Sequence, residues 1–307
     1  MTNKEKYCTQ PHLWSQLPVF CQPWWLDTVC KSWDLALVER QEAIIAIYPY
    51  SVETKLGITL IRPAPLTAFS GPLILDKTII QREKLIAELI QQLPSSGFHF
   101  FNTMPDVNLA DYAGFEDYAI KERVTYQIAL RTTEAAMFEN LEGKRRNDIR
   151  KAMKELHVDN TALSAEEFSS WQDRMFSNKQ VKNPYSVALL EKVFQAARHQ
   201  NASLSLKAID NNGHCYGAAW FLYDKEVMYY MLSATHPEHR HRGAIGLLIW
   251  HAMVQANEMG LKIFDFEGSQ DPGIASFFRK FGGQQKKYFS FEKTTAPLWK
   301  LKRKLLG

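Results

Sequence analysis

Two acidic residues at the end of an apolar stretch are the first candidates for chemistry. Asp265 and Glu267 alternate with Phe264 and Phe266, so both carboxylates would project from one face of a strand over 261–266. Apolar neighbours raise the pKa of a carboxyl group, which suits a general base that works near neutral pH. The pattern also fits a buried Asp265 satisfied by backbone N–H groups and a Glu267 that caps the next helix.

A basic loop upstream could hold an anionic group. It spans 235–243 and contains Arg240, Arg242 and Gly243, and an apolar helix then begins at Ala244. Helix N-termini present free N–H groups and partial positive charge, so they receive phosphates well. The loop therefore predicts a phosphate site, with a charged surface turn as the alternative.

The strand over 226–233 is expected to face the same site. Tyr230 could protonate a leaving group, although an aromatic residue of a core sheet is the commoner explanation. Ser233 lies at the strand end and is assigned to donor binding.

A metal site is not expected. The same loop contains His236, His239 and His241, but the spacing fixes no carboxylate partner for them. The four cysteines include no CxxC pair, so neither a zinc site nor a disulfide framework follows.

A second basic segment covers 144–154. Its spacing predicts an amphipathic helix, and Arg146 and Arg150 line one face of it. Together with Lys280 they are candidates for binding substrate phosphates; a solvated helix face is equally plausible. The C-terminus adds the cations Lys300, Lys302, Arg303 and Lys304.

The elements around these residues change character near residue 133. The first part reads as a sheet with few helices, with strands near 35–39, 43–48, 57–61, 98–101 and 125–130 and a helix over 78–93. The second part predicts helices followed by strands near 204–209, 215–223 and 226–233, the apolar helix, the strand 261–266, a short helix and a last strand near 287–291. We therefore expect an N-terminal domain over 1–132 and a C-terminal domain over 133–307 that carries the donor site.

The bulk properties are those of an ordinary globular protein. The chain has 307 residues, 46% hydrophobic and 23% charged, with a formal net charge of +4, so no general binding of polyanions is indicated. We find neither an apolar stretch typical of a signal peptide nor a run of about 18 apolar residues that could span a membrane. These features predict a cytoplasmic protein.

Several motifs together resemble the FemAB/CelD-like branch of the GNAT acyltransferase superfamily. They are the strand end 264–269 with the helix 273–282, the basic helix 144–152 and the Pro/Gly loop 64–72. The resemblance implies an α/β (α+β) fold of two tandem GNAT-like domains, each a mixed, mostly antiparallel sheet flanked by helices. It also implies transfer of an acyl or aminoacyl group, from a thioester or an aminoacyl-tRNA, to an amine.

The chain departs from the family pattern at two places. The GNAT donor loop usually reads [QR]-x-x-G-x-[GA], and here Ile245 occupies the place of the small residue. In the peptidoglycan-bridge enzymes the short helix carries a lysine associated with catalysis, and here that place is Phe278. The second departure argues against aminoacyl-tRNA as the donor.

The function expected from the resemblance is N-acyl transfer from acyl-CoA, a co-substrate and not a tightly bound cofactor, to an amine on a small molecule or a cell-envelope precursor. Glu267, Asp265 and Tyr230 are the expected catalytic residues. Two alternatives stay open: an aminoacyl-tRNA-dependent transferase that acts on a cell-wall precursor, and a non-catalytic binding protein for an anionic metabolite.

Overall fold

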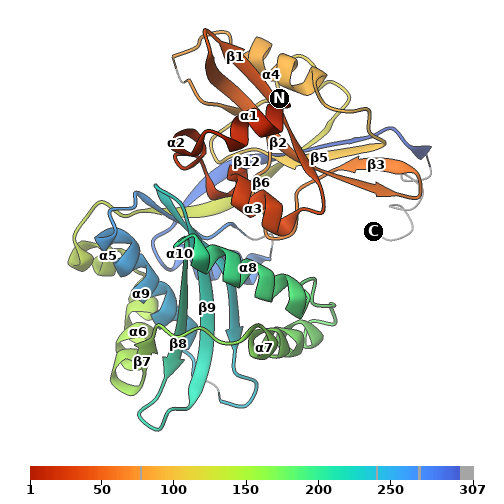
Figure 1. Cartoon of the computed structure of the whole chain (residues 1–307). Helices are drawn as coiled ribbons and strands as arrows, with labels where there is room; N and C mark the ends of the chain where they lie inside the picture. Colours follow the sequence, from red (N-terminus) through yellow and green to blue (C-terminus); the bar gives the residue numbers. More distant parts are fainter. Residues whose placement is uncertain (77, 240, 269–270, 298–307) are drawn as a thin grey trace. The chain divides into compact units, whose positions relative to one another are not determined.

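The computed structural model describes residues 1–76, 78–239, 241–268 and 271–297, and the chain divides into two compact units (Figure 1). The first unit comprises Met1–Val124 together with the described residues from Lys286 onward, and the second comprises Thr125–Gln285. No helix among the described residues is long and apolar enough to cross a bilayer.

The first unit is a mixed sheet covered by short helices. Its strands are β1 (Trp33–Arg40), β2 (Ala43–Lys55), β3 (Ile58–Ile61), β4 (Leu73–Ile74), β5 (Phe98–Asn102), the first part of β6 (Ala119–Ala129) and most of β12 (Gln284–Thr294). Its helices are α1 (Asn3–Cys8), α2 (Pro11–Trp14), the 3-10 helix η1 (Val19–Cys21), α3 (Pro23–Val29) and α4 (Arg82–Gln91). The strands follow the order β1-β2-β3-β5-β12, β4 pairs β2, and β3 and β5 run parallel.

The second unit is built around an antiparallel sheet with one parallel pair. Its strands are the last part of β6, β7 (His157–Asp159), β8 (Ser203–Ile209), β9 (Cys215–Tyr223), β10 (Val227–Thr235) and β11 (Ile263–Asp265). Its helices are α5 (Glu134–Asn140), α6 (Gly143–Glu155), α7 (Ala165–Ser177), α8 (Val187–His199), α9 (Ala244–Glu258) and α10 (Pro272–Arg279). The strand order is β6-β11-β10-β9-β8-β7, and among the described strands of this unit only β10 and β11 pair in parallel.

The helices of the second unit begin where their sequences supply caps. The side chains of Ser164, Ser186 and Asp271 accept backbone N–H groups in the first turns of α7, α8 and α10. Helix α9 has no such cap and is apolar on most sides, because it packs against β8 and β9 and beside α6 (Figure 1). The sheet and α9 thus form a rigid support for the residues at the end of β10.

The mixed α/β fold class is confirmed, but the two units do not divide the chain at residue 132. The end of β6 pairs with β11, which places residues 125–132 in the second unit. Strand β12 pairs with β5 from Ser290 to Thr294, which returns the chain to the first unit. Pairing between strands distant in sequence, not a change of composition, sets these boundaries.

Candidate functional site

One large cavity lies within the second unit. Its volume is about 1060 Å³, and it is bordered by the end of β10, the loop after β11, helix α10, the end of α7 and the entry to α9. The residues that line it include Lys179, Tyr185, Tyr230, Ser233, Arg242, Ile245, Glu267, Phe277 and Phe278. This volume is large enough for an elongated small-molecule ligand.

The cavity opens where two parallel strands separate. The pairing of β10 with β11 ends at Tyr229↔Asp265, whereas β10 continues to Thr235. An irregularity between Tyr230 and Leu232 interrupts the register of β10 with β9 at the same place. Beyond Tyr229, in the described part of the chain, the β11 side of β10 therefore has no strand partner, and its backbone groups are available to a ligand.

Glu267 lies at the mouth of this opening in a strained conformation. Its φ of 57° is left-handed, a region that costs a non-glycine residue about 1–3 kcal/mol and is concentrated at functional sites. Its Oε1 atom is buried without a hydrogen-bond partner, and the residue borders the cavity. Burial, and then the nearby charge of Asp265, raises the pKa of Glu267 well above its ordinary value.

Asp265 is fully buried and does not line the cavity. Its carboxylate accepts hydrogen bonds from Thr125 Oγ1 (2.5 Å), Gln127 Nε2 (2.7 Å) and the backbone N–H of Glu267 (2.7 Å). Burial raises the pKa of Asp265, and these three donors oppose the shift. The two carboxylates do not share one strand face, because β11 ends at Asp265 and the backbone turns before Glu267.

Two tyrosines face the cavity near Glu267. The hydroxyl of Tyr230 donates to Ser233 Oγ (2.5 Å), and burial raises the pKa of Tyr230 to about 12. Tyr185 was not predicted from the sequence; burial and the charge of Glu267 raise its pKa, so it lies within electrostatic reach of that carboxylate. The only signal for it in the sequence is an aromatic residue after the Asn183-Pro184 turn.

The basic loop contributes less to the cavity than its sequence predicts. Arg240 lies outside the described residues, Arg242 lines the cavity, and Ala244 is fully buried at the start of α9. His241 faces Glu155, with 2.8 Å between Nε2 and Oε2, and its Nδ1 accepts the N–H of Gly243. The described residues contain no group of histidine, cysteine or acidic side chains arranged to hold a metal ion.

Gly243 is required by helix packing. A Cβ atom at this position would lie 2.6 Å from the carbonyl oxygen of Asp148 and 2.9 Å from the Cβ of Ala152, both on α6. The glycine thus allows the close approach of α6 to the first turn of α9.

Replacing Gly243 by Ala should lower the free energy of unfolding by about 1–3 kcal/mol, because the added methyl group overlaps the α6 backbone. Urea titration followed by tryptophan fluorescence measures the loss. Gly143→Ala is the matched control, since the nearest atom to its new Cβ would be 4.0 Å away. Equal stability of the two variants would show that the α6 contact does not constrain position 243.

The predicted phosphate-binding arginines of α6 do not reach the cavity. Arg146 Nη1 donates to the carbonyl of Glu139 (3.2 Å), and the Arg150 guanidinium lies 5.1 Å from the ring centre of Phe138. Lys280 instead lines a second cavity of about 220 Å³, together with Lys144, Arg145, Asp148, Arg242 and Phe277. Arg242 and Phe277 border both cavities.

Phe278, at the place of the family lysine, is part of an aromatic cluster. It is 4% exposed, and its ring stacks on Phe266 at 4.6 Å between centroids. Tyr126 and Tyr230 lie about its other sides. No cation can occupy this position without disrupting the cluster.

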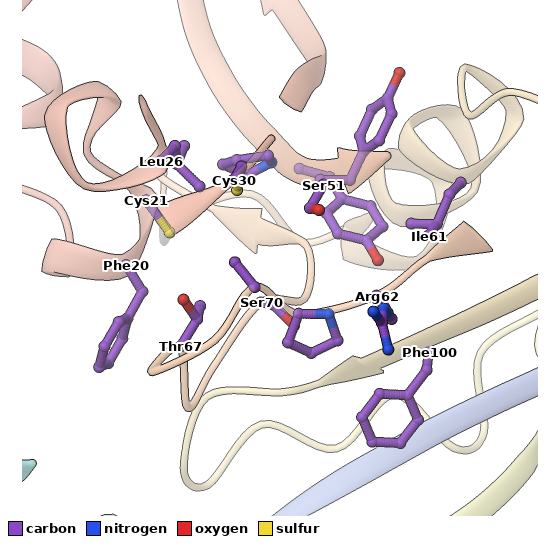
Figure 2. Close-up of a pocket in the computed structure, with 15 residues that line it drawn as sticks. Phe20, Cys21, Leu26, Cys30, Ser51, Ile61, Arg62, Thr67, Ser70 and Phe100 are labelled. Atoms are coloured by element: carbon purple, nitrogen blue, oxygen red, sulfur yellow. The ribbon is translucent and has the colours of Figure 1, made fainter. Parts of the chain in front are cut away.

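A cavity in the first unit is too small for a substrate. It encloses about 20 Å³ near Cys21, Ser51, Arg62 and Ser70, whose labelled side chains border it in Figure 2. A cavity needs roughly 10–15 Å³ to hold a single water molecule. The buried hydroxyl of Ser70, which borders this cavity, has no hydrogen-bond partner among the described residues.

Comparison with known proteins identifies a domain family within the second unit. Residues 143–277 match the family described as "Acetyltransferase (GNAT) domain". A search of curated proteins finds no significant match.

Among solved structures, FemX is similar with a TM-score of 0.70 and 13% identity, over 98% of each chain. A tandem GNAT protein from the clavulanic acid biosynthesis pathway gives a TM-score of 0.55 at 10% identity, over 96% of this chain and 97% of that one. L-PGS from Bacillus licheniformis gives a TM-score of 0.50 at 13% identity, over 84% of this chain and 83% of that one. At such identities the likeness shows the fold, which is the tandem GNAT fold.

The family match covers residues 143–277, which include every residue that lines the large cavity except Phe278, and the fold match covers nearly the whole chain. Residues 143–277 therefore match a GNAT domain within the second unit, and the chain as a whole has the tandem GNAT fold.

Proposed function

We propose that the protein transfers an acyl group from acyl-CoA to an amine by direct attack within the large cavity of the second unit. One observation carries this proposal: a single cavity is bordered by Glu267, whose carboxylate has an unpartnered oxygen, by the free edge of β10 and by the entry to α9. These are a base, a set of backbone donors and a cationic entry, which together suffice for acyl transfer from a phosphate-bearing thioester.

The donor would lie along β10. Backbone groups beyond Tyr229 would bind the pantetheine amides as an added strand, with Ser233 beside them. Arg242 and the first turn of α9 would face the phosphates. Ile245 packs onto β9, since a Cβ on Gly217 would lie 2.9 Å from its Cδ1, so the family's small residue is replaced by a side chain that fills the sheet surface.

In the proposed reaction the amine nitrogen attacks the carbonyl carbon of the thioester. A C–N bond forms, the C–S bond breaks, and Glu267 takes the proton that the nitrogen loses. N–H groups of β10 stabilise the negative charge on the carbonyl oxygen in the transition state. Tyr230, protonated at neutral pH because its pKa is about 12, gives a proton to the departing thiolate.

Asp265 is assigned a positioning role. Its hydrogen bond to the N–H of Glu267 holds the left-handed turn, while Thr125 and Gln127 fix the Asp265 carboxylate from β6. Its charge also contributes to the raised pKa of Glu267. Asp265 therefore acts through Glu267 and does not touch the substrate.

Replacing Asp265 by Asn should move the acid limb of the pH profile of kcat/KM to lower pH. Glu267 works deprotonated, so the rate rises as pH passes its pKa, and removing the neighbouring charge lowers that pKa. Burial, the larger cause of the raised pKa, remains in the variant. The acid limb should therefore still lie at a pH above 4.5, the ordinary pKa of a glutamate. An unchanged or upward-shifted limb would contradict this electrostatic coupling.

The acceptor class follows from the same carboxylate. An ammonium group entering the cavity would supply the hydrogen-bond partner that Glu267 Oε1 lacks, which favours a primary amine. The resemblance to FemAB-like enzymes suggests an amine on a small molecule or a cell-envelope precursor. An aminoacyl-tRNA donor receives less support, because Phe278 replaces the family lysine and is buried.

Release of free thiol tests the proposal. Acetyl-CoA and a panel of primary amines are incubated with the protein, and thiol is measured with a colorimetric reagent alongside mass spectrometry of the amide. Amine-dependent thiol release in step with amide formation is expected. Transfer from aminoacyl-tRNA and not from acetyl-CoA would identify the alternative donor. If neither donor supports turnover, the result would favour a binding protein.

A further inference from the structure

The smaller cavity of the second unit combines cations from three separate elements. Lys144 and Arg145 come from α6, Arg242 from the entry to α9, and Lys280 from the end of α10. Asp148 is the one carboxylate in the described lining. The lining is therefore strongly positive, although the chain as a whole has a formal net charge of only +4.

Arg145 is the most unusual member of this group. It is 7% exposed, and its guanidinium lies 4.2 Å from the ring centre of Phe277 and 4.9 Å from that of Phe281. Its Nε atom is buried and has no hydrogen-bond partner. Burial lowers the pKa of Arg145, as does the charge of Arg242 to a smaller extent, whereas the charges of Asp148 and Glu142 oppose the shift.

The packing around Arg145 makes room for its guanidinium. A Cβ on Gly246 of α9 would lie 3.1 Å from Arg145 Nη1, so this glycine keeps the first turn of α9 close to the charge. The cations also lack strong internal partners. Within the described residues no carboxylate lies within 4.0 Å of Lys144, Arg145 or Arg242, and Lys280 Nζ only reaches Glu142 at 4.0 Å.

The dimensions of the cavity suit a phosphate group. Its volume of about 220 Å³ is several times the roughly 30 Å³ that one water occupies in the liquid. Planar guanidinium groups bind phosphate through paired hydrogen bonds, and lysines supply compact positive charge. A phosphate ester in this cavity would lie beside Arg145, Lys144, Arg242 and Lys280.

The position of the cavity connects it with the reaction. Arg242 and Phe277 border both this cavity and the large one, so the two cavities are neighbours that share these two side chains. We infer that the cationic cavity holds a phosphate group of the acyl donor, so that side-chain cations select phosphorylated donors. The identity of that donor as acyl-CoA rests on the proposed function, whereas phosphate binding by the cavity does not.

This assignment gives the departure at Ile245 a physical meaning. With a large side chain in place of the family's small residue, the donor loop lacks part of its usual pattern. The cations of α6 and α10 supply charge from outside that loop. The shared chemistry is a phosphate ester, which is present in CoA and also in RNA.

The test compares ligands that differ in their phosphates. Calorimetric titrations use CoA, dephospho-CoA, 4′-phosphopantetheine, pantetheine and, separately, bulk tRNA. The first variant, Lys144→Ala/Lys280→Ala, removes the charges of the exposed Lys144 and the partly exposed Lys280. The second variant, Arg145→Met, removes the buried charge and keeps much of the buried volume. Lys151→Ala/Lys154→Ala is the matched control, with the same charge change at exposed positions of α6 outside the cavity.

In the wild type we expect affinity to fall at least tenfold between CoA and pantetheine, since charge-assisted contacts of this kind are strong. The two cavity variants should lose most of that difference and bind pantetheine like the wild type, while the control pair retains it. The inference would be overturned if the lysine double variant kept the same difference in affinity between CoA and pantetheine as the control pair. It would also be overturned if the wild type bound CoA and pantetheine equally well.

The two proposals can fail separately. Salt-sensitive tRNA binding that the cavity variants abolish, without CoA binding, would support the phosphate site and contradict the acyl-CoA donor. Turnover of acetyl-CoA that is unaffected by the cavity substitutions, at donor concentrations below saturation, would support the proposed reaction and contradict the phosphate site.

Discussion

Replacing Glu267 by Gln should lower kcat for acyl transfer by about 10²–10⁴-fold and leave the affinity for acetyl-CoA within about twofold of the wild type. Gln has the size of Glu but cannot accept the proton of the amine. The buried Oε1 atom and the raised pKa of Glu267 are the reasons for proposing this side chain as the base. Initial rates are measured with the amine that the wild-type chain acylates fastest, and affinity by calorimetry.

Glu258→Gln is the control for this substitution. Glu258 is exposed at the end of α9, and replacing it by Gln removes the same charge. It should retain wild-type kcat. A Glu267→Gln variant with more than about half of the wild-type kcat would remove Glu267 from the mechanism, whatever its effect on donor affinity.

Replacing Phe278 by Ala should lower the free energy of unfolding by about 3–5 kcal/mol, the usual loss for a large aromatic side chain in a core. Phe278 is 4% exposed and joins α10 to the strands through Phe266, Tyr126 and Tyr230. The cluster also forms one wall of the large cavity. We therefore expect donor affinity to fall as well, because the wall loses its support.

Urea titration of Phe278→Ala and Phe278→Leu measures this effect, and Leu should recover part of the stability. Met259→Ala is the comparison, since Met259 is 48% exposed and its truncation should cost less than about 1 kcal/mol. If Phe278→Ala is no less stable than Met259→Ala, the aromatic cluster does not hold α10 in place.

Local sequence patterns were sufficient to predict the order of elements around the site. Alternating apolar residues predict β8 and β9, and the apolar run after Gly243 predicts α9. These patterns depend on neighbours a few residues apart, so they can be read without the fold. The predictions that Glu267 is the base and that Tyr230 and Ser233 lie beside it stay predictions, and all three side chains line the same cavity.

Other features depend on contacts between distant parts of the chain. The buried role of Asp265 follows from Thr125 and Gln127, which lie 140 and 138 residues earlier. The sequence equally permits Arg145 or Arg146 to face a ligand, and packing of α6 against Phe277 and Phe281 turns Arg145 inward. For the same reason, no local signal shows that β12 pairs with β5 and returns to the first unit.

A crystal structure with a ketone analogue of acetyl-CoA, which cannot transfer its acyl group, tests the central claim most directly. The account predicts that the analogue lies along β10 beyond Tyr229, with its carbonyl near Glu267 and its phosphates beside Arg242. An analogue bound at saturating concentration elsewhere, or one that leaves the large cavity of the second unit empty, would contradict the account.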